Sequence, residues 1–396
     1  MTDRAKDYDA IVVGAGIAGS GMAAALAGQG WRTLLLDRGR LPQHKACGEF
    51  LSPESADSLA WLGCEGLAER LGAVPITRVR LLASGGAELS FSLRSPAQGI
   101  SRFALDEALR EDAAAKGADI RAGVTVREIR PLPEGGWAVE TDGEDGPASL
   151  LARAAFGAWG RQRAPGRPAS LRQDGREGSV SVRGRAPGRI GRKTQLEGVP
   201  LTDAVELYLF DGGYAGVAPV EGGRTNVAAV LDARLGRSGA LRGSEWLEAV
   251  AARHPPLADR LAGGRPVTGS DSSAAPIRPS RDPVAWGAVP HIGDAAIVVP
   301  PLCGDGMAMA LRSVRLCAPL ADAYLRGAVS LDGWRDAYAR ALRREFRAPA
   351  RRGGLLQAAL LQPRLAAALL RAGALAPGIA AQLFHATRVG EAPPPR

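Results

Sequence analysis

The chain has 396 residues, of which 46% are hydrophobic, 23% charged and 5% aromatic. This is an ordinary globular composition with enough apolar mass for two or three domains, and it excludes a disordered chain, a collagen and a disulfide scaffold. The formal net charge is +9, and only four of the 50 basic residues are lysines. The last 63 residues hold eleven arginines against three acidic residues, so almost all of the excess lies in this basic C-terminal segment.

Cysteines and termini set further limits. Cys47, Cys64, Cys303 and Cys317 form no C-x-x-C pair and no metal-ligand spacing, so we expect no metal site. No signal peptide precedes the first strand pattern, and no uncharged apolar run reaches about 18 residues. We expect a cytoplasmic protein without a spanning helix. Nucleic acid is not an expected partner, because no basic and aromatic recognition motif accompanies the charge.

The first predicted unit is β-α-β. Residues 8–13 are short, rich in β-branched residues and followed by glycine, which is typical of a buried strand. A helical pattern over residues 17–29 and a second strand over 33–36 complete the unit, and Asp37 follows directly. The turn between the first strand and the helix reads Gly14-Ala15-Gly16-Ile17-Ala18-Gly19.

This G-x-G-x-x-G sequence predicts dinucleotide binding because a strand precedes it, a helix follows it and an acid lies about 20 residues further on. Gly14 permits the tight turn, Gly16 lets the backbone approach a pyrophosphate, and Gly19 lets helix and strand pack closely. The helix N-terminus offers free N–H groups to the phosphates. Asp37 is placed to accept hydrogen bonds from the adenosine ribose hydroxyls.

The middle of the chain contains two kinds of sequence pattern. A helix is expected over residues 105–116 and a strand over 124–129, while residues 76–93 and 206–231 have the alternation of β-hairpins around glycine pairs. We therefore expect a separate β-sheet domain inserted into the cofactor-binding domain. The predicted limits are 1–75, 96–160 and 270–330 for the cofactor-binding domain, 76–95 and 161–269 for the substrate-binding sheet domain, and 331–396 for a C-terminal helical segment.

A second glycine cluster identifies the cofactor. Residues 292–296 read Ile-Gly-Asp-Ala-Ala, and residues 301–307 read Pro-Leu-Cys-Gly-Asp-Gly-Met. Together with Gly14 to Gly19, and Arg102 followed by Asp106 and Leu109, these motifs resemble the FAD-dependent oxidoreductases of the p-hydroxybenzoate hydroxylase-type fold, close to the geranylgeranyl reductase branch. The resemblance covers residues 8–330. It implies an α/β fold: a Rossmann-like FAD-binding domain of glutathione-reductase type, an inserted antiparallel β-sheet substrate domain and a C-terminal helical tail.

The resemblance also implies roles for single residues. Asp294 is similar to the acid that accepts from the ribityl hydroxyls, and Arg102 to the arginine that anchors FAD. Val126 resembles the strand residue near the adenine. Gly304, Gly306 and Met307 would open a helix facing the flavin, whose reduced form a helix N-terminus stabilises. The other residues expected to contact FAD are Ile17, Ala18, Arg38 and the loop residues Lys45, Cys47 and Gly48, which resemble the reductase-branch loop against the isoalloxazine.

Three residues are candidates for catalysis. Cys47 and Cys303 are expected near each other at the flavin, where they would form a redox pair, line the substrate pocket, or be two unreactive small side chains. Tyr214 and Pro219 are expected in the pocket wall. Gly216 and Ala218 stand where relatives of this fold carry aromatic residues, which predicts a wide cavity for a bulky or extended substrate.

One position departs from the family. Many hydroxylases of this fold carry an Asp-Gly motif that serves FAD and NADPH, but this chain has Trp159 at the place of the aspartate, and an indole cannot accept a hydrogen bond. NAD(P)H stays a candidate electron donor. Either it binds differently here, or the electrons arrive from another donor.

Three functions remain open. The first is a monooxygenase that hydroxylates an aromatic or polyketide-like metabolite through a flavin C4a-hydroperoxide, which must be kept dry. The second is a reductase of prenyl-chain or other alkene bonds, which the Lys45-x-Cys47-Gly48 loop favours. The third is a non-redox cyclase or binding protein that has kept FAD. We favour the oxygenase, because the pocket signature of prenyl reductases is not intact.

The expected partner is a small apolar or aromatic molecule. The basic C-terminal segment has apolar runs at residues 355–361 and 365–370 between its arginines. Such a segment either rests on an anionic membrane surface or packs on the FAD domain as a helical tail. Contact with a membrane would favour a lipid-like substrate, and with it the reductase.

Overall fold

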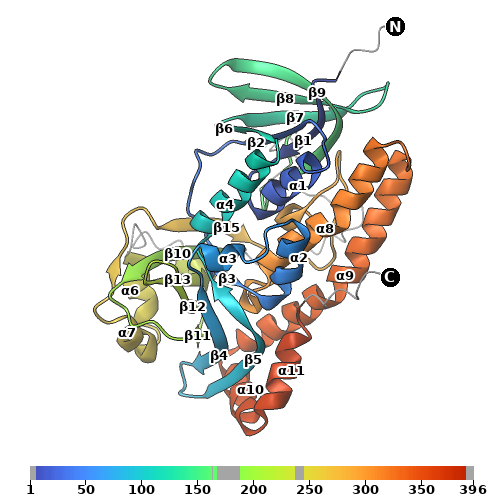
Figure 1. Cartoon of the computed structure of the whole chain (residues 1–396). Helices are drawn as coiled ribbons and strands as arrows, with labels where there is room; N and C mark the ends of the chain where they lie inside the picture. The colour runs from blue at the N-terminus through green and yellow to red at the C-terminus, as the bar shows by residue number, and fades with distance from the viewer. Residues whose placement is uncertain (1–5, 163, 167–187, 237–244, 389–396) are drawn as a thin grey trace.

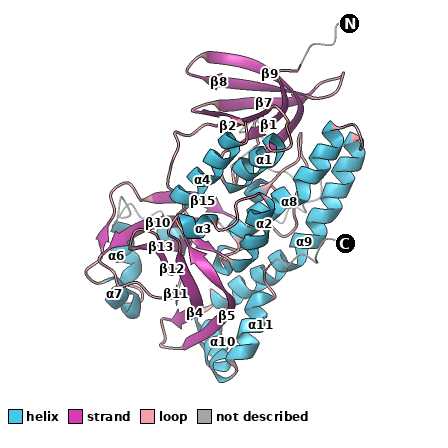
Figure 2. Cartoon of the chain, in the orientation of Figure 1, coloured by secondary structure: helices cyan, strands magenta, loops and turns pink. Residues whose placement is uncertain are grey.

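The computed structural model describes residues 6–162, 164–166, 188–236 and 245–388. Figure 1 shows two β-sheets at opposite ends of the molecule, with a group of helices between them. A long C-terminal helix runs along one side from the first sheet to the second (Figures 1 and 2).

The first sheet is built around the predicted β-α-β unit. Its strands β6, β2, β1 and β9 are parallel, and β9, β8 and β7 form an antiparallel meander. Parallel neighbours need a crossover connection, which a helix supplies between β1 and β2. In spatial order the strands are β6 (Asp119–Ala122), β2 (Thr33–Asp37), β1 (Tyr8–Val13), β9 (Gly146–Gly157), β8 (Trp137–Gly143) and β7 (Thr125–Pro131).

The second sheet is larger and collects strands from distant parts of the chain. In spatial order it consists of β14 (Arg265–Pro266), β10 (Arg189–Glu197), β13 (Arg224–Leu231), β12 (Gly213–Val220), β11 (Ala204–Phe210), β4 (Val74–Ala83), β5 (Glu88–Gly99) and β3 (Phe50–Leu51), with β15 (Ser272–Ile277) beside β10. Most neighbours are antiparallel, but β11 and β4 are parallel. The sheet is thus mainly antiparallel, as predicted, and the parallel pair is the place where two hairpins from separate segments join.

The helices form three groups. The first packs between the sheets, where α1 contacts both α4 and α8. The second lies on one face of the second sheet, and the third is C-terminal. The groups are α1 (Ile17–Ala27), α2 (Ala56–Trp61), α3 (Leu67–Arg70), α4 (Arg102–Ala115) and α8 (Gly306–Leu325); α5 (Ala233–Gly236), α6 (Glu245–Ala251) and α7 (Pro255–Leu261); and α9 (Leu331–Leu360), α10 (Pro363–Leu375) and α11 (Pro377–His385).

The period of two along a strand gives the second sheet two different apolar faces. Tyr208 and Phe210 of β11 lie in a buried cluster with residues of α6 and α7. Leu207 and Leu209 point to the other face, where they join a cluster with Leu370 of α10 and Phe384 of α11. The sheet is thus covered on both sides, and the C-terminal helices are part of its packing.

The predicted fold class is confirmed: the chain has a Rossmann-like unit, a second sheet domain and C-terminal helices. The domain limits stay a prediction, and the strands of the second sheet run past them. β5 continues to Gly99 and β15 begins at Ser272, although residues 96–160 and 270–330 were assigned to the cofactor-binding domain. Residues 157–193 are rich in glycine, proline and arginine, which predicts connecting loops with short strands, and much of this range lies outside the described residues.

Among the described helices, no single one is long and apolar enough to cross a membrane. Taken together, α9 and α10 have the length and apolar composition of a membrane-spanning segment, but the two helices meet at a bend of 108°.

The contact between α1 and the turn before it leaves no room for a side chain at Gly19. A Cβ there would lie 1.7 Å from the Gly14 carbonyl oxygen, so Gly19→Ala must push helix and strand apart. We expect the free energy of unfolding to fall by at least about 2 kcal/mol, measured by urea denaturation. Gly85→Ala is the matched control, since a Cβ there meets no atom within 4 Å. Equal denaturation midpoints for wild type and Gly19→Ala would contradict this packing.

Candidate active site

The turn between β1 and α1 is held by the carboxylate of Asp37. Its Oδ2 accepts a hydrogen bond from the Ala15 N–H at 2.7 Å, and its Oδ1 accepts one from the Gly39 N–H at 2.7 Å. Gly14 has φ of 109°, a conformation that glycine adopts without steric cost. Asp37 therefore supports the turn first, and each of its oxygens keeps a second lone pair for another donor.

The start of β7 lies beside Asp37. The Val124 N–H donates to the Asp37 carbonyl oxygen at 2.9 Å, which brings this end of β7 next to the end of β2. Val126, two residues further on, is half-buried against the main core. Arg38 is exposed. The structure thus places Asp37 and the segment before Val126 next to each other, at the carboxyl end of β2.

Two cations share one carboxylate in front of the turn. Arg102 Nε and Nη2 donate to Asp106 at 2.7 and 2.8 Å, and Lys45 Nζ donates to Asp106 Oδ2 at 2.8 Å. Burial alone would raise the pKa of Asp106, but the charges of Arg102 and Lys45 lower it, so the carboxylate stays ionised. One positive charge of this cluster is left uncompensated by Asp106.

This charge faces the backbone of Gly16. A Cβ at position 16 would lie 3.4 Å from Lys45 Nζ and 3.5 Å from Arg102 Nη2, so both cations border the space in front of the glycine. Gly16 is also the N-cap of α1, whose first N–H groups have no partner inside the helix. A helix N-terminus with two adjacent cations is a site for a phosphate or pyrophosphate group. The arrangement fits the dinucleotide that the sequence predicts.

Asp294 lies in a short 3-10 helix, η2 (Gly293–Ala295), where the chain returns to the first sheet. Its Oδ2 is 3.7 Å from Nε of Arg161. The backbone N–H of Gly293 donates to the buried hydroxyl of Ser313 on α8, which ties this turn to the helix. Asp294 is half-buried, with its carboxylate close to a cation of the pocket wall.

The second glycine loop leads into α8. Gly304 has φ of 69° and follows a second 3-10 helix, η3 (Pro301–Cys303), while Gly306 begins α8 and Met307 is buried in it. The buried N-cap residue of α8, Asp305, accepts a hydrogen bond from the Ser52 hydroxyl at 2.9 Å. The turn therefore fixes the N-terminus of α8 beside the pocket, which Gly304 lines.

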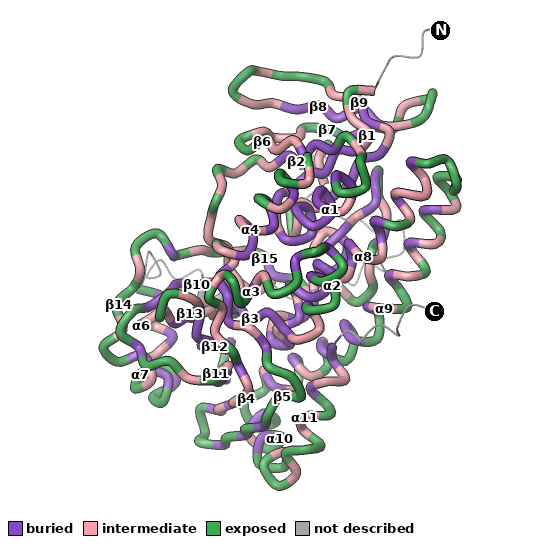
Figure 3. Tube along the Cα trace, viewed as in Figure 1, coloured by how far each residue is buried: buried purple, intermediate pink, exposed green. Residues whose placement is uncertain are grey.

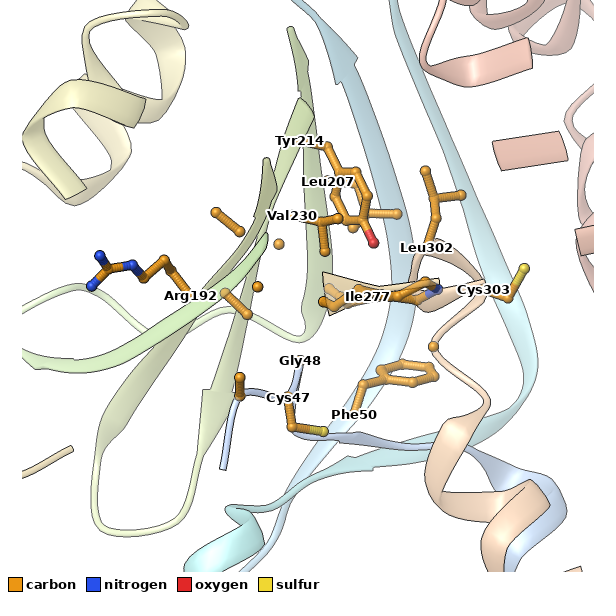
Figure 4. Close-up of a pocket in the computed structure, with 18 of the residues that line it drawn as sticks. Cys47, Gly48, Phe50, Arg192, Leu207, Tyr214, Val230, Ile277, Leu302 and Cys303 are labelled. Atoms are coloured by element: carbon orange, nitrogen blue, oxygen red, sulfur yellow. The ribbon is translucent and has the colours of Figure 1, made fainter. Parts of the chain in front are cut away.

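A pocket that is partly open to solvent lies between the second sheet and these loops (Figure 4), and its empty space, the solvent-filled mouth included, is about 750 Å³. Its wall is mostly apolar. The residues that line it are Ala46, Cys47, Gly48, Phe50, Val79, Arg161, Gly191, Arg192, Val205, Leu207, Tyr214, Gly216, Ala228, Ala229, Val230, Ile277, Pro301, Leu302, Cys303, Gly304 and Phe384. The structure thus brings the two cysteines, Tyr214, Gly48 and Gly304 to one cavity, as the sequence predicts.

The loop from Lys45 to Glu49 is fastened to the second sheet by a buried ion pair. Lys193 Nζ of β10 lies 3.0 Å from Glu49 Oε1, and both side chains are fully buried. Glu49 also accepts from the Gln195 side chain at 2.9 Å and from the Arg102 backbone N–H at 3.0 Å. The Asn226 side chain donates to the Cys47 carbonyl oxygen at 3.1 Å. These contacts fix the loop against the pocket.

Glu49 is held in an unfavourable backbone conformation. Its φ of 55° is the one positive value among the described residues other than glycine. A long side chain adopts this region rarely and only where the surroundings enforce it. Burial raises the pKa of Glu49, whereas Lys193 and the two N–H donors favour its charged form. The strain and the buried charge make this the most constrained point of the loop.

The sequence patterns assign no role to Glu49, nor to Lys193, Gln195, Asn226, Phe50 or Phe384. A usable signal existed for Lys193, since it is one of only four lysines in a chain that otherwise uses arginine. A compact ammonium and a planar guanidinium are not interchangeable in a buried site. The phenylalanines carried no such signal, because their side chains look like ordinary core residues.

The hypothesis of a redox pair does not fit the geometry. Cys47 and Cys303 line the same pocket, but both are free, and the Cys303 sulfur is directed away from Cys47 (Figure 4). A Cβ at Gly353 of α9 would lie 2.7 Å from Cys303 Sγ, so this sulfur packs against the C-terminal helix. Burial raises the pKa of Cys47 and raises that of Cys303 to about 11, so both are thiols at neutral pH.

The two β12 positions at which aromatic residues are replaced by small ones differ in their relation to the pocket. Gly216 lines the cavity, as expected. Ala218 instead packs with Phe50 and Ile76 in a small separate cluster, and Pro219 is not among the lining residues. Tyr214 is buried and lines the cavity, and its hydroxyl has no hydrogen-bond partner among the described residues.

Trp159 fills the space that a glycine leaves at the end of β9. A Cβ at Gly157 would lie 2.3 Å from the indole ring, and the ring makes an edge contact with His291 at 5.2 Å between centroids. The indole is therefore a packing residue at this edge of the first sheet. Among the described residues, no three His, Cys, Asp or Glu side chains are grouped as metal ligands.

The buried ion pair generates a stability prediction. Lys193→Met leaves the Glu49 charge buried without its cation, which should lower the free energy of unfolding by about 3–5 kcal/mol. The double variant Glu49→Gln, Lys193→Met removes both charges and should recover most of that loss. Thermal unfolding of the three proteins measures the difference. A double variant no more stable than Lys193→Met would show that the pair does not act as a unit.

Comparison with known proteins agrees with this geometry. The family of the FAD binding domain matches residues 7–342. The menaquinone reductase of Mycolicibacterium smegmatis is 28% identical over 344 residues, which cover 79% of this chain and 76% of that protein. The digeranylgeranylglycerophospholipid reductase 2 of Methanopyrus kandleri is 29% identical over 324 residues, covering 80% and 77%.

The fold is also found in solved structures. A geranylgeranyl bacteriochlorophyll reductase-like protein from Thermoplasma acidophilum superposes with a TM-score of 0.75 at 19% identity, covering 96% of this chain and 95% of that one. Flavin-dependent halogenases share the fold at similar scores. Since the family match spans most of the chain and its relatives are reductases, the protein belongs to the FAD binding domain family and is an FAD-dependent oxidoreductase.

Proposed function

We propose that this flavoprotein saturates a carbon–carbon double bond in a long apolar lipid of the prenyl type. The observation that carries the proposal is the apolar pocket between the second sheet and the Lys45–Glu49 loop. The named sequence relatives support it, since both are reductases, one of menaquinone and one of a geranylgeranylated phospholipid. Alkene reduction thereby takes the place of hydroxylation as the first hypothesis.

The residues along the first sheet would hold FAD. The α1 N-terminus from Gly14 to Gly19, with Lys45 and Arg102, fits the pyrophosphate, because the cations border the space in front of Gly16. Asp37 and the start of β7 would face the adenosine. The remaining proposed contacts are Asp294 on the ribityl chain and Gly48, Gly304, Gly306 and Met307 around the flavin.

The chemistry divides between cofactor and chain. Reduced FAD supplies a hydride when bound, and the protein positions the double bond and provides a proton. The Cys47 thiol and the Tyr214 hydroxyl both line the pocket, and burial raises the pKa of each, so each carries its proton at neutral pH. An apolar substrate bound against this apolar wall would displace water from the double bond. We assign no step to Cys303, because its sulfur packs toward α9.

The electron donor is part of the proposal. We propose NAD(P)H, bound without the usual Asp-Gly motif, since Trp159 stands there as a packing residue. The alternative is a partner reductase. Anaerobic titration of the flavin absorbance distinguishes them, because bleaching by NADPH or NADH supports a direct donor, whereas bleaching by dithionite alone supports a partner.

The reaction itself gives the next prediction. The FAD-loaded protein, reduced without oxygen, should add a hydride and a proton across one double bond of a menaquinone side chain or a geranylgeranyl lipid. By mass spectrometry the product is heavier by two hydrogen atoms and keeps that mass after exposure to air, which would reverse a mere reduction of the quinone ring. A product heavier by one oxygen atom, formed only in air, would instead establish the monooxygenase. Unchanged lipid after complete reoxidation of the flavin would contradict the alkene reductase.

Removal of the Tyr214 hydroxyl group tests whether this residue contacts the substrate. Its buried hydroxyl has no described partner, so we expect it to hydrogen-bond the substrate, and Tyr214→Phe should lower kcat/KM about 5- to 20-fold. Stability should not fall, because no internal hydrogen bond is lost. Tyr208→Phe is the matched control on the opposite face of the sheet, where the hydroxyl bonds to Glu206 at 3.3 Å.

The control should show the reverse pattern, with unchanged kinetics and reduced stability. A Tyr214→Phe protein that is less stable but equally active would show that this hydroxyl serves the fold and not the substrate.

A further inference from the structure

The outer side of α10 and α11 carries unusually many exposed apolar side chains. Leu375 is 90% exposed, and Ile379 and Leu383 are about 60% exposed. Leu365 and Leu369 on α10 are also exposed. A large apolar side chain that is exposed singly is ordinary, but a contiguous group marks an interaction site. In Figure 3 the outer turns of these helices are mostly green, at the end of the molecule farthest from the first sheet.

Three of these side chains form a strip along α10, and Ile379 and Leu383 lie on α11. With 3.6 residues per turn, Leu365, Leu369 and Leu375 fall within one side of the helix, and Arg364 and Arg371 fall together along its edge. Both arginines are exposed, and neither pairs with an acid among the described residues. An apolar strip beside a basic edge is the pattern of a helix that lies in a membrane interface.

The net positive charge of the surrounding segment also favours contact with an anionic surface. Six arginines and no acidic residue lie between Glu345 and Glu391. Arg347 and Arg351 of α9 are partly satisfied, since both reach Asp282, at 2.7 and 3.2 Å. The charge on α10 has no such compensation among the described residues. Anionic lipid headgroups attract basic residues at about 1 kcal/mol each.

The inner side of the same helices belongs to the pocket. Phe384 of α11 lines the cavity, next in sequence to the exposed Leu383. Three residues later, the Thr387 hydroxyl donates a hydrogen bond to the Phe384 carbonyl oxygen at 2.7 Å. Arg388, which is buried, pairs with Glu54 at 3.1 Å and with Asp305 at 3.8 Å. The helix pair therefore separates the pocket from the exposed strip and is anchored on the loop before α8.

We propose that α10 and α11 dock on an anionic lipid membrane, with the strip of Leu365, Leu369, Leu375, Ile379 and Leu383 in the interface and Arg364 and Arg371 on headgroup phosphates. The docked face lies directly behind the pocket wall, so docking places the pocket next to the membrane. That this membrane holds the substrate rests on the proposed function. The docking itself rests only on exposure and charge.

The test uses the full-length holoenzyme and sedimentation with vesicles. Vesicles of phosphatidylcholine and phosphatidylglycerol in equal amounts should bind the protein, and vesicles of phosphatidylcholine alone should bind it at least tenfold more weakly. The variant Leu375→Asp, Ile379→Asp, Leu383→Asp should lose binding about tenfold or more. The matched control is Leu201→Asp, Val284→Asp, which changes two exposed apolar residues elsewhere, and it should bind as wild type does.

Two further variants separate charge from apolar contact. Arg364→Gln and Arg371→Gln should each weaken binding to the mixed vesicles about fivefold, as one surface charge predicts. All variants should keep the FAD absorbance and the melting temperature of wild type, since the changed side chains are exposed. Equal binding by the triple Asp variant and wild type would overturn the proposal. So would a wild-type dimer in light scattering that the triple variant converts to a monomer, because the strip would then be a contact between two copies.

Turnover measurements distinguish a failure of membrane docking from a failure of the proposed reaction. With a detergent-dispersed lipid the triple variant should turn over at the wild-type rate, and with the same lipid in mixed vesicles it should be slower. Membrane binding without any alkene reduction would refute the proposed reaction and leave the docking surface standing. Alkene reduction at equal rates in both assays would refute a role of the docking surface in substrate delivery.

Discussion

The charge of the Glu49 carboxylate is buried between β10 of the second sheet and the start of α4, and the placement of the Lys45–Glu49 loop depends on how that charge is compensated. Lys193 and Gln195 reach it from β10 of the second sheet, and the backbone N–H of Arg102 reaches it from the start of α4. An unpaired buried charge would cost several kcal/mol, so these partners hold the loop in a single position. The positive φ of Glu49 is a second sign of that constraint.

The loop separates two chemical environments. On the side of the first sheet, Lys45 and Arg102 share Asp106 beside the N-terminus of α1, which suits an anionic group. On the other side, Cys47 and Gly48 border the apolar pocket of the second sheet. A short segment thus lies between a site that suits a phosphate group and an apolar pocket.

The Rossmann-like unit could be predicted from the sequence because short-range rules determine it. The turn needs its three glycines at Gly14, Gly16 and Gly19, and the carboxylate of Asp37, at the end of the next strand, accepts a hydrogen bond from that turn. The pocket walls could be predicted only in part. Ala218 was expected to widen the cavity but packs beside Phe50, because the pocket ends before it along β12. Phe384 joins the wall from more than 300 residues away from Cys47, and no local pattern records such a contact. The sequence left open whether the two cysteines form a pair or only line the pocket, because side-chain direction is a tertiary property.

The central claim, that reducing equivalents pass to a double bond of a lipid in this pocket, is tested most directly by a single anaerobic turnover in D2O. The reduced holoenzyme, mixed with one equivalent of a menaquinone or geranylgeranyl lipid, should yield a product carrying two deuterium atoms on adjacent carbons, located by mass spectrometry and NMR. Reoxidised flavin with undeuterated lipid, or a product that forms only with oxygen, would contradict the account.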